Sequence, residues 1–177
     1  MSEHEQSHAT ISAQVPDWSR EHKPFGAWQP SRALLASLRA YQRHRASRTP
    51  WAHAGRVAAV LRFRFWSAVT GADIPLNARI AGGLLMPHPN GIVIHPEAEV
   101  GPNCLLFQQV TLGRGPRPGA PRLGGHVDVG AGAKVLGGVV IGDHARIGAN
   151  AVVLDDVPPD TVVVGIPARP AKPPRPR

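Results

Sequence analysis

A six-residue period constrains this chain more than any other feature. From Ile74 to Val153 an aliphatic side chain recurs, and ten of the twelve intervals between successive members are six residues long. A second set of compact apolar residues follows most of these aliphatics by four positions. Neither an α-helix nor a β-hairpin has this period. The recurring positions are Ile74, Ile80, Met86, Ile94, Val100, Leu106, Leu112, Leu123, Val129, Val135, Ile141, Ile147 and Val153.

A period of six with one inward aliphatic per unit is typical of a β-helix, a solenoid in which short flat strands alternate with turns. Three strands make one triangular coil of about 18 residues, and each aliphatic stacks on its counterparts in the coils above and below. An ordinary Val- and Ile-rich sheet protein is disfavoured, because period-2 alternation is poor and hairpin turn signals do not recur. The sequence therefore predicts a mainly β protein built as a parallel β-helix.

Two interruptions of the period mark candidate functional segments. The interval from Met86 to Ile94 is eight residues, and the interval from Leu112 to Leu123 is eleven. Residues expelled from a packed repeat face solvent or a ligand, and loops on a rigid scaffold are where sites tend to lie. The first interruption contains His88, and the second is rich in Arg, Pro and Gly.

The chain divides into four segments, of which only one carries the six-residue period. The segment before it shows helical spacing of apolar residues instead. The N-terminus has little hydrophobic pattern, so we expect it to be poorly ordered. The C-terminus is basic and Pro-rich, which predicts a polyproline-like or disordered tail. The segments are residues 1–25, the N-terminus; 26–70, the helical region; 71–168, the β-helix; and 169–177, the tail.

Two short helices are expected before the repeat. The first starts near Pro30 with Ser31 as its N-cap, and the second runs from Pro50 to Gly71. Because the open end of a solenoid needs a cover, these helices are suited to cap the first coil. They could equally pack against other subunits.

The charge of the chain is unevenly distributed. The net charge is +8, yet residues 66–165 carry six Lys/Arg and eight Asp/Glu, whereas residues 18–65 carry ten and one. No nucleic-acid-binding motif accompanies the basic excess, so we interpret it as a solvated helix surface and a basic tail. There is no signal-peptide pattern, no apolar run long enough to span a membrane, and only one cysteine, Cys104. We expect a cytoplasmic protein without nucleic-acid binding or membrane insertion.

Five short motifs stand out in the periodic segment: Ala72–Pro75, His88–Ile94, Gln108–Gly113, Gly130–Val135 and Val163–Ala168. Together they resemble the serine acetyltransferases and their close relatives among the hexapeptide-repeat acyltransferases, over about residues 71–169. The resemblance implies a left-handed β-helix, a homotrimer, acetyl-CoA as acyl donor, and active sites in grooves between neighbouring prisms.

The family's catalytic pair falls on Asp73 and His88. Asp73 precedes the strand led by Ile74, and His88 precedes the strand led by Ile94 one coil later, so both are expected at the same edge of the prism. A carboxylate there can fix the tautomer of the imidazole and raise the basicity of its other nitrogen. The resemblance implies His88 as general base and Asp73 as its orienting residue. Without the resemblance, we would interpret His88 as an exposed loop residue and Asp73 as a turn or cap residue.

The resemblance also implies a path for the acyl donor. In the family, the pantetheine arm runs along the later coils against small-residue turns, where small side chains let a ligand approach the backbone. Basic residues nearby are candidates to meet the phosphates of CoA, although each alone reads as an ordinary surface charge. The matching positions are Gly132, Ala133, Ala149 and Ala151 for the arm, and Lys134, Arg169, Arg146 and Lys172 for the phosphates.

The resemblance implies that an Asp directly before the catalytic His and an Arg-His pair after the long loop hold serine, and here these positions are Pro87 and Gly119-Ala120. A further departure from the family is His95-Pro96 in place of a Gly-Glu pair. We therefore expect an acetyl-CoA-dependent O-acetyltransferase of serine acetyltransferase type that acts on a small-molecule acceptor alcohol. The alternative is a sugar, exopolysaccharide or natural-product O-acetyltransferase with a non-serine acceptor. Arginines of the long loop, Arg114, Arg117 and Arg122, could receive an anionic acceptor or be simply solvated.

Two other classes of function use the same fold. A zinc enzyme like the β-helical carbonic anhydrases needs three converging imidazoles. Four histidines are available, but the paired spacing of that family is absent, so no metal is expected. A non-catalytic trimeric scaffold is the second option, and the presence of both catalytic residues argues against it. The four histidines are His88, His95, His126 and His144.

Overall fold

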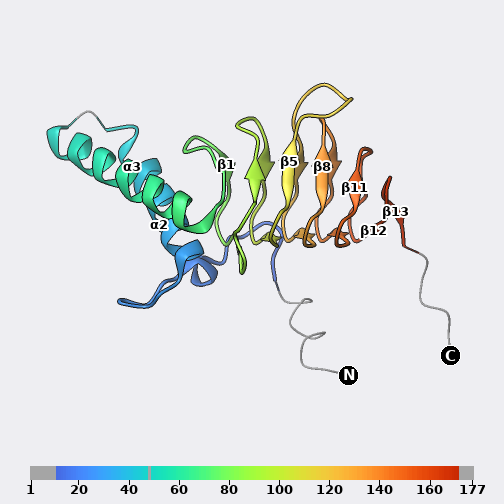
Figure 1. Ribbon diagram of the computed structural model, residues 1–177, viewed down its shortest axis with the longest axis horizontal. Coiled ribbons are helices and arrows are strands. Elements are labelled where there is room, and N and C mark those ends of the chain that lie inside the picture. The colour runs from blue at the N-terminus through green and yellow to red at the C-terminus, as the bar shows by residue number, and fades with distance from the viewer. Residues whose placement is uncertain (1–10, 48, 172–177) are drawn as a thin grey trace.

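The computed structural model describes residues 11–47 and 49–171. It shows a three-sided parallel β-helix with a helical hairpin at its N-terminal end (Figure 1). Our expectations for residues 1–10 and 172–177, including Lys172, lie outside the described residues.

Strands of two or three residues form the three walls of the β-helix, and each of the coils from β3 to β11 contributes one strand to each wall. We number these walls as sheets 1 to 3. Sheet 1 contains β1 (Arg79–Ile80), β3 (Glu99–Val100), β6 (Arg122–Leu123) and β9 (Val140–Ile141). Sheet 2 contains β4 (Leu105–Leu106), β7 (Asp128–Val129), β10 (Arg146–Ile147), β12 (Val162–Val164) and the antiparallel β13 (Arg169–Pro170). Sheet 3 contains β2 (Val93–Ile94), β5 (Thr111–Gly113), β8 (Lys134–Leu136) and β11 (Val152–Val153).

The strand register confirms the predicted stacking. In sheet 3, Ile94 pairs with Leu112, Leu112 with Val135, and Val135 with Val153. All of the aliphatic positions in the six-residue period are buried, from Ile74 through Val153, and they belong to one continuous core. Apolar burial therefore fixes which side of each short strand faces inward.

The two predicted helices are α2 (Pro30–His44) and α3 (Pro50–Thr70). Each has Pro in its first turn, and α3 ends at Gly71, whose φ of 66° is left-handed. The predicted cap is wrong, however: Ser31 lies inside α2, and the N-cap is Gln29 without a side-chain bond. Among the helices that the structure describes, none is long and apolar enough to cross a membrane.

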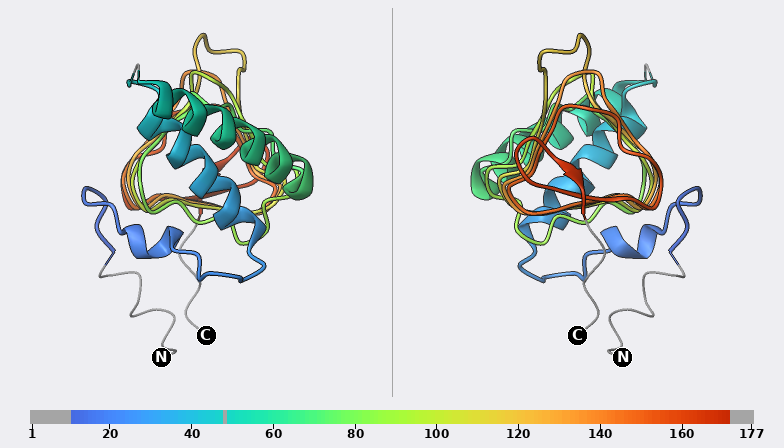
Figure 2. Two further views of the ribbon diagram at one scale, coloured as in Figure 1. Left: turned by 90° about the vertical axis from the view of Figure 1, so that its left-hand side faces the viewer. Right: turned by 90° about the vertical axis from the view of Figure 1, so that its right-hand side faces the viewer.

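The helical hairpin covers the first coil of the β-helix (Figure 2). From α2, Leu34, Leu35 and Leu38 are fully buried in the core that continues into the β-helix, and Phe63 joins them from α3. The prediction of a capping hairpin is thus correct for these residues. In contrast, the apolar residues that recur at helical spacing along α3 face away from the core. They are Val57, Leu61, Phe65 and Val69, and all four are exposed.

Residues 11–25 correct our expectation of a poorly ordered N-terminus. They contain a short 3₁₀-helix, η1 (Trp18–Glu21), and the preceding residues lie along the turns that join sheet 1 to sheet 2. We call residues 11–21 the N-terminal strap. Ser12 and Asp17 make local hydrogen bonds, and the other polar contacts of the strap are with residues far away in the sequence, which hydrophobic patterning cannot detect. The strap is thus bound by tertiary hydrogen bonds rather than by a local preference.

Candidate active site

One column of turns carries three of the predicted site residues, His88, Gly132 and Ala149. These turns join sheet 2 to sheet 3, and we call them the His88 edge; they comprise residues 87–91, 107–109, 130–132 and 148–150. Backbone hydrogen bonds connect the turns from coil to coil: Gln109 N donates to Asn90 O at 2.9 Å, and Gly132 N to Gln108 O at 2.8 Å. The edge is therefore a continuous ridge along the prism.

His88 lies in the first turn of the His88 edge, and Asp73 lies beside that end of the edge, one coil earlier. Asp73 forms a parallel bridge with Val93, and its backbone is bonded on both sides to the next coil. His88 lies in the turn just before Gly91, whose N–H donates to Gly71 O at 3.0 Å. Both side chains are exposed. The structure thus brings the two residues to the same corner of the prism, as their spacing predicted.

Residues with left-handed backbone recur along the edge. Gly91, Gln109, Gly132 and Asn150 have φ values of 70°, 59°, 72° and 56°. A Cβ at Gly132 would collide with the side-chain oxygen of Asn150 in the next coil. Gly132 therefore suits the left-handed corner without strain, whereas a side chain there would have to displace that of Asn150, whether or not a ligand passes over it.

The small residues predicted to line the donor path differ in what they expose. Ala133 and Ala151 are fully buried, and their N–H and C=O groups already take part in turn and ladder hydrogen bonds. They therefore shape the edge from beneath. Ala149, in contrast, is exposed on the same ridge. Of the three alanines, only Ala149 presents its side chain to a ligand.

The predicted phosphate-binding residues already have partners in the chain. Lys134 Nζ donates to Gln109 O at 2.5 Å, connecting two coils of the edge. Arg169 follows the last turn and donates to Asp155 at 2.9 Å. Arg146 lies on sheet 2, 4.0 Å from Asp128. Because Lys134 and Arg169 remain near the edge and accessible, they are the better placed of the three to meet an anion.

Sequence reasoning assigned no role to Gln108, which the structure places in the second turn of the His88 edge. Its side-chain Oε1 is buried and has no hydrogen-bond partner among the described residues. Leaving a buried acceptor unpaired costs about 1–3 kcal/mol, so this oxygen is disposed to accept a hydrogen bond from a ligand. The signal in the sequence was the Gln108-Gln109 pair at a position where other coils carry small residues.

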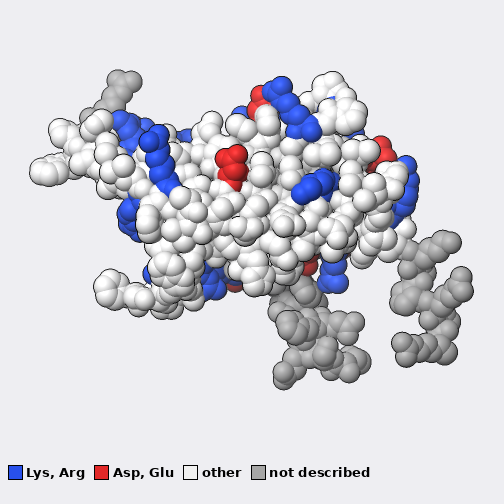
Figure 3. All heavy atoms as spheres, in the orientation of Figure 1, with Lys and Arg blue, Asp and Glu red and all other residues white. Residues whose placement is uncertain are grey.

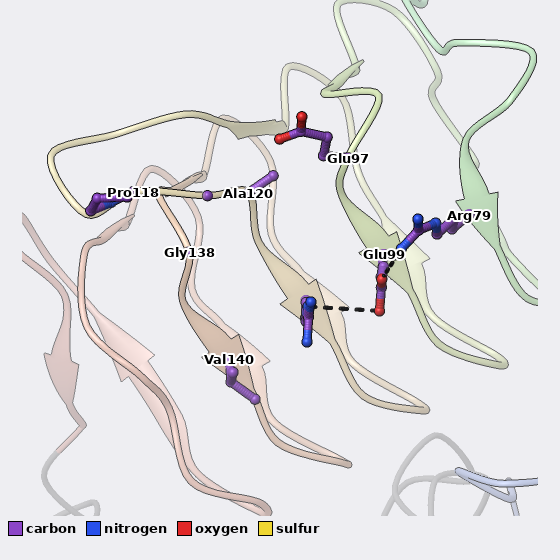
Figure 4. Close-up of a pocket in the computed structure, with 9 residues that line it drawn as sticks. Arg79, Glu97, Glu99, Pro118, Ala120, Gly138 and Val140 are labelled. Carbon is purple, nitrogen blue, oxygen red and sulfur yellow. Dashed lines mark hydrogen bonds and ion pairs between the residues drawn. The ribbon is translucent and has the colours of Figure 1, made fainter.

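A polar groove lies elsewhere, on sheet 1 beneath the long loop. It has a volume of about 520 Å³, and Figure 4 shows Pro118 and Ala120 on the long loop at one side of it and Arg79 and Glu99 on β1 and β3 at the other. Gly119 completes the loop side of this groove. Within one chain, sheet 3 separates the groove from the His88 edge.

The arginines of the long loop each lie near a carboxylate. Arg117 donates to Asp156 at 2.8 Å, Arg114 approaches Glu97 at 3.4 Å, and Arg122 lies 3.8 Å from Glu99. These exposed pairs neutralise much of the positive charge of the loop. The structure therefore favours a solvated loop over a strong site for an anionic acceptor.

The four histidines considered for a zinc site lie at three different corners. His88 is on the edge named after it, and His95 follows sheet 3. His126 and His144 lie beside the N-terminal strap, with their Nδ1 atoms 2.8 Å apart. Among residues 11–47 and 49–171, no group of three or more His, Cys, Asp or Glu side chains is arranged to hold a metal ion.

The fold and the edge define a class of protein: an acyltransferase-type β-helix of hexapeptide repeats. The family model for bacterial transferase hexapeptide (six repeats) matches residues 121–155. The serine acetyltransferase of Mycobacterium tuberculosis is 42% identical over 129 residues, covering 71% of this chain and 56% of that protein.

Solved structures of serine acetyltransferases are also similar to this chain. The soybean serine acetyltransferase apoenzyme is 32% identical with a TM-score of 0.60, covering 78% of this chain and 69% of that one. A serine acetyltransferase in complex with CoA is 30% identical with a TM-score of 0.67, covering 81% and 57%. This chain belongs to the serine acetyltransferase family, and its β-helix is left-handed as in that family. It spans about half the length of the curated relatives it matches.

Proposed function

We propose that this protein is an acetyl-CoA-dependent O-acetyltransferase of serine acetyltransferase type. The observation that carries the proposal is the position of Asp73 and His88 at one end of the His88 edge, with small-residue turns continuing from them. The names of the relatives support acetyl transfer to serine. The acetyl donor favours a cytoplasmic location, because acetyl-CoA is a cytoplasmic metabolite.

In the proposed reaction, His88 takes the proton of the acceptor hydroxyl as its oxygen attacks the thioester carbonyl. Asp73 orients the imidazole and stabilises the imidazolium that forms. Collapse of the tetrahedral intermediate breaks the carbon–sulfur bond, and the imidazolium returns the proton to the CoA sulfur. The products are the O-acetyl ester and CoA. A positioned base of this kind contributes about 10²–10⁴ in rate.

The donor is proposed to lie along the His88 edge. Ala149 and the backbone near Gly132 offer an approach for the pantetheine arm, with Ala133 and Ala151 forming the floor beneath it. Lys134 and Arg169 are proposed to meet the phosphates, after exchanging their present partners for the ligand. An anionic phosphate is a stronger partner for these cations than a backbone carbonyl or a fully exposed carboxylate.

A homotrimer is part of the proposal. The His88 edge is a convex ridge in one chain, so a neighbouring prism is needed to turn it into a groove that excludes water. The second face of such a groove would then come from another copy of this chain.

A second candidate function keeps the reaction and changes the acceptor. The loop positions that hold serine in the family carry Gly119 and Ala120, which present no polar side chain to the groove they line. Pro87 replaces a carboxylate beside His88. These replacements favour a sugar or natural-product hydroxyl over serine, whereas the sequence relatives favour serine.

The test is CoA release from acetyl-CoA with L-serine and with a panel of sugars and hydroxylated metabolites. We expect His88→Ala to lower transfer by about 10²–10⁴ while CoA affinity stays within a few fold, because the base acts on the acceptor. His95→Ala is the matched control, since His95 lies at another corner and its Nδ1 accepts from Glu97 N. Near-normal turnover by His88→Ala would remove His88 from the mechanism, and absence of CoA binding by the native chain would favour a scaffold.

A further inference from the structure

The outward side of α3 is apolar along the entire helix. At 100° per residue, its exposed apolar residues fall on the side opposite to the buried Ala52, Ala59 and Phe63. Leu61 and Phe65 at its centre are 62% and 57% exposed, and Trp51 near its start is 86% exposed. We call this surface the α3 face: Trp51, Ala54, Val57, Ala58, Leu61, Phe65, Ala68 and Val69.

An α-helix that is apolar on two opposite sides is normally enclosed on both. The buried side of α3 already packs on the body of the protein, so the α3 face is a second apolar surface with no cover among the described residues. Scattered exposed apolar residues need no explanation, but a contiguous patch marks a site of interaction.

Aromatic residues extend the α3 face beyond the helix. Phe65 contacts Trp66 with ring centroids 5.0 Å apart, and Trp66 contacts Trp28 at 5.5 Å. Trp28 is itself 74% exposed. The large ring of Trp, with its polar N–H, is favoured at the boundary between water and lipid.

The charge around the α3 face is positive. Residues 18–65 carry ten Lys/Arg against one acidic residue, and that residue, Glu21, is bound to Arg39 at 2.8 Å. Arg62 and Arg64 are exposed on α3 at the borders of the face. On the side shown in Figure 3, the helical end has Lys and Arg but no Asp or Glu. The partner of this surface should therefore be anionic.

This charge disfavours a two-fold contact between the α3 faces of two copies. Such a contact would bring Arg62 and Arg64 of both copies together, with no acidic residue on either helix to pair with them. The two ends of this chain are also unsuited to cover the α3 face. Residues 172–177 are basic, and residues 1–10 contain no apolar residue larger than Met1.

A concavity beside the α3 face supplies a place for an anionic group. It lies between α2 and α3, has a volume of about 400 Å³, and is floored by Val57, Val60 and Leu61. Arg45 and Arg56 line it together with Tyr41. Guanidinium groups beside an apolar floor suit a phosphate whose attached chains continue into an apolar phase.

We propose that the α3 face docks this protein on an anionic phospholipid surface, with α3 lying in the plane of the interface. Helices that lie on membranes combine a basic border with Trp, Phe and Leu on the apolar side. The 21 residues of α3 extend over about 31 Å, and in the proposed orientation the whole helix lies parallel to the membrane surface. Docking requires no spanning segment, and it is independent of acetyl transfer.

The test is cosedimentation of the full chain with vesicles, measured without substrates. We expect at least about tenfold more binding to phosphatidylcholine vesicles with roughly 30 mol % phosphatidylglycerol than to pure phosphatidylcholine. Raising salt from about 0.1 M to about 0.5 M should weaken this binding severalfold. The double variant Leu61→Glu/Phe65→Glu should lose it, and Arg62→Gln/Arg64→Gln should reduce it on anionic vesicles.

Val162→Glu/Val164→Glu is the matched control, because it places two acidic residues at exposed apolar positions of β12, at the other end of the β-helix. It should bind vesicles like the native chain. Three results would overturn the proposal: no binding to either vesicle, equal loss in the β12 control, or a smaller oligomer in Leu61→Glu/Phe65→Glu, which would make the α3 face a subunit contact. Binding of an acidic amphipathic peptide in place of vesicles would likewise assign the face to a protein partner.

Discussion

Asn103 shows how a single polar side chain can hold a segment in place. It is fully buried, Nδ2 donates to Ser12 O at 2.6 Å and Val15 O at 2.8 Å, and Oδ1 accepts from Asp17 N at 2.8 Å. Its φ is 60°, a conformation that Asn tolerates better than most residues. Asn103 thus meets both the turn geometry and the polar groups of the N-terminal strap.

We predict that Asn103→Ala lowers the free energy of unfolding by about 2–4 kcal/mol, because three hydrogen bonds are lost in a buried place. Chemical denaturation measures this change. Asn150→Ala is the control: Asn150 has a similar φ of 56° but is exposed, so it reports the backbone cost alone, about 1 kcal/mol. Equal losses in the two variants would mean that the hydrogen bonds between Asn103 and the strap contribute nothing to stability.

Cys104 is a buried thiol in the core of the β-helix. Burial raises its pKa from the ordinary value of 9.0 to about 12, and Sγ donates to Gly124 O at 3.2 Å. The thiol is therefore neutral and inaccessible in the folded protein.

Two outcomes follow for Cys104. A thiol reagent at pH 8 should label it only after unfolding, as mass spectrometry would detect. Since the folded pKa is above the unfolded one, the unfolded chain loses its proton first, and stability should fall as pH rises from about 9 toward 12. Rapid labelling of the native protein would contradict the buried position.

At the scale of elements, one ion pair joins three parts of the fold. Arg39 on α2 donates to both oxygens of Glu21 on η1, at 3.0 and 2.8 Å, and to the carbonyls of Ile80 and Ala81 at 2.7 Å each. Glu21 also accepts from Gly83 N at 2.9 Å. The helical hairpin, the strap and the first coil are therefore held at one point.

We predict that Arg39→Met destabilises the protein by about 3–5 kcal/mol, because it leaves the charge of Glu21 buried without its partner. The side chains of this pair are only 16% and 7% exposed. Arg79→Met removes the exposed Arg79–Glu99 pair and should cost less than about 1 kcal/mol in the same urea titration. If adding Glu21→Gln to Arg39→Met restores no stability, the loss does not come from the unpaired charge.

The whole molecule is proposed to be a homotrimer, since one chain offers only a ridge at the His88 edge. Light scattering coupled to size exclusion should give a mass about three times the 18.8 kDa of the chain. A monomer with full transferase activity would show that the site is complete in one prism. A variant that dissociates the assembly should lose activity in parallel with its mass.

Much of the fold could be predicted from the sequence because a β-helix repeats one local rule. Each coil buries the same positions, so the period alone located the strands from Arg79 to Val153 and the stacking of Ile94 on Leu112. The same regularity made the interruption around His88 visible. The spacing of Asp73 and His88 therefore predicted their common edge without any knowledge of contacts.

The sequence by itself determined the β-helix, the capping hairpin and the edge that carries Asp73 and His88. Only the tertiary structure decided which non-local contacts form: it binds the N-terminal strap through Asn103, pairs Arg117 and Arg169 with carboxylates, and buries Ala133 under the proposed donor path. It also turned the apolar side of α3 outward. Periodicity reports that a residue is apolar at a given spacing, whereas the side it faces and the polar group it meets depend on segments far away in the chain.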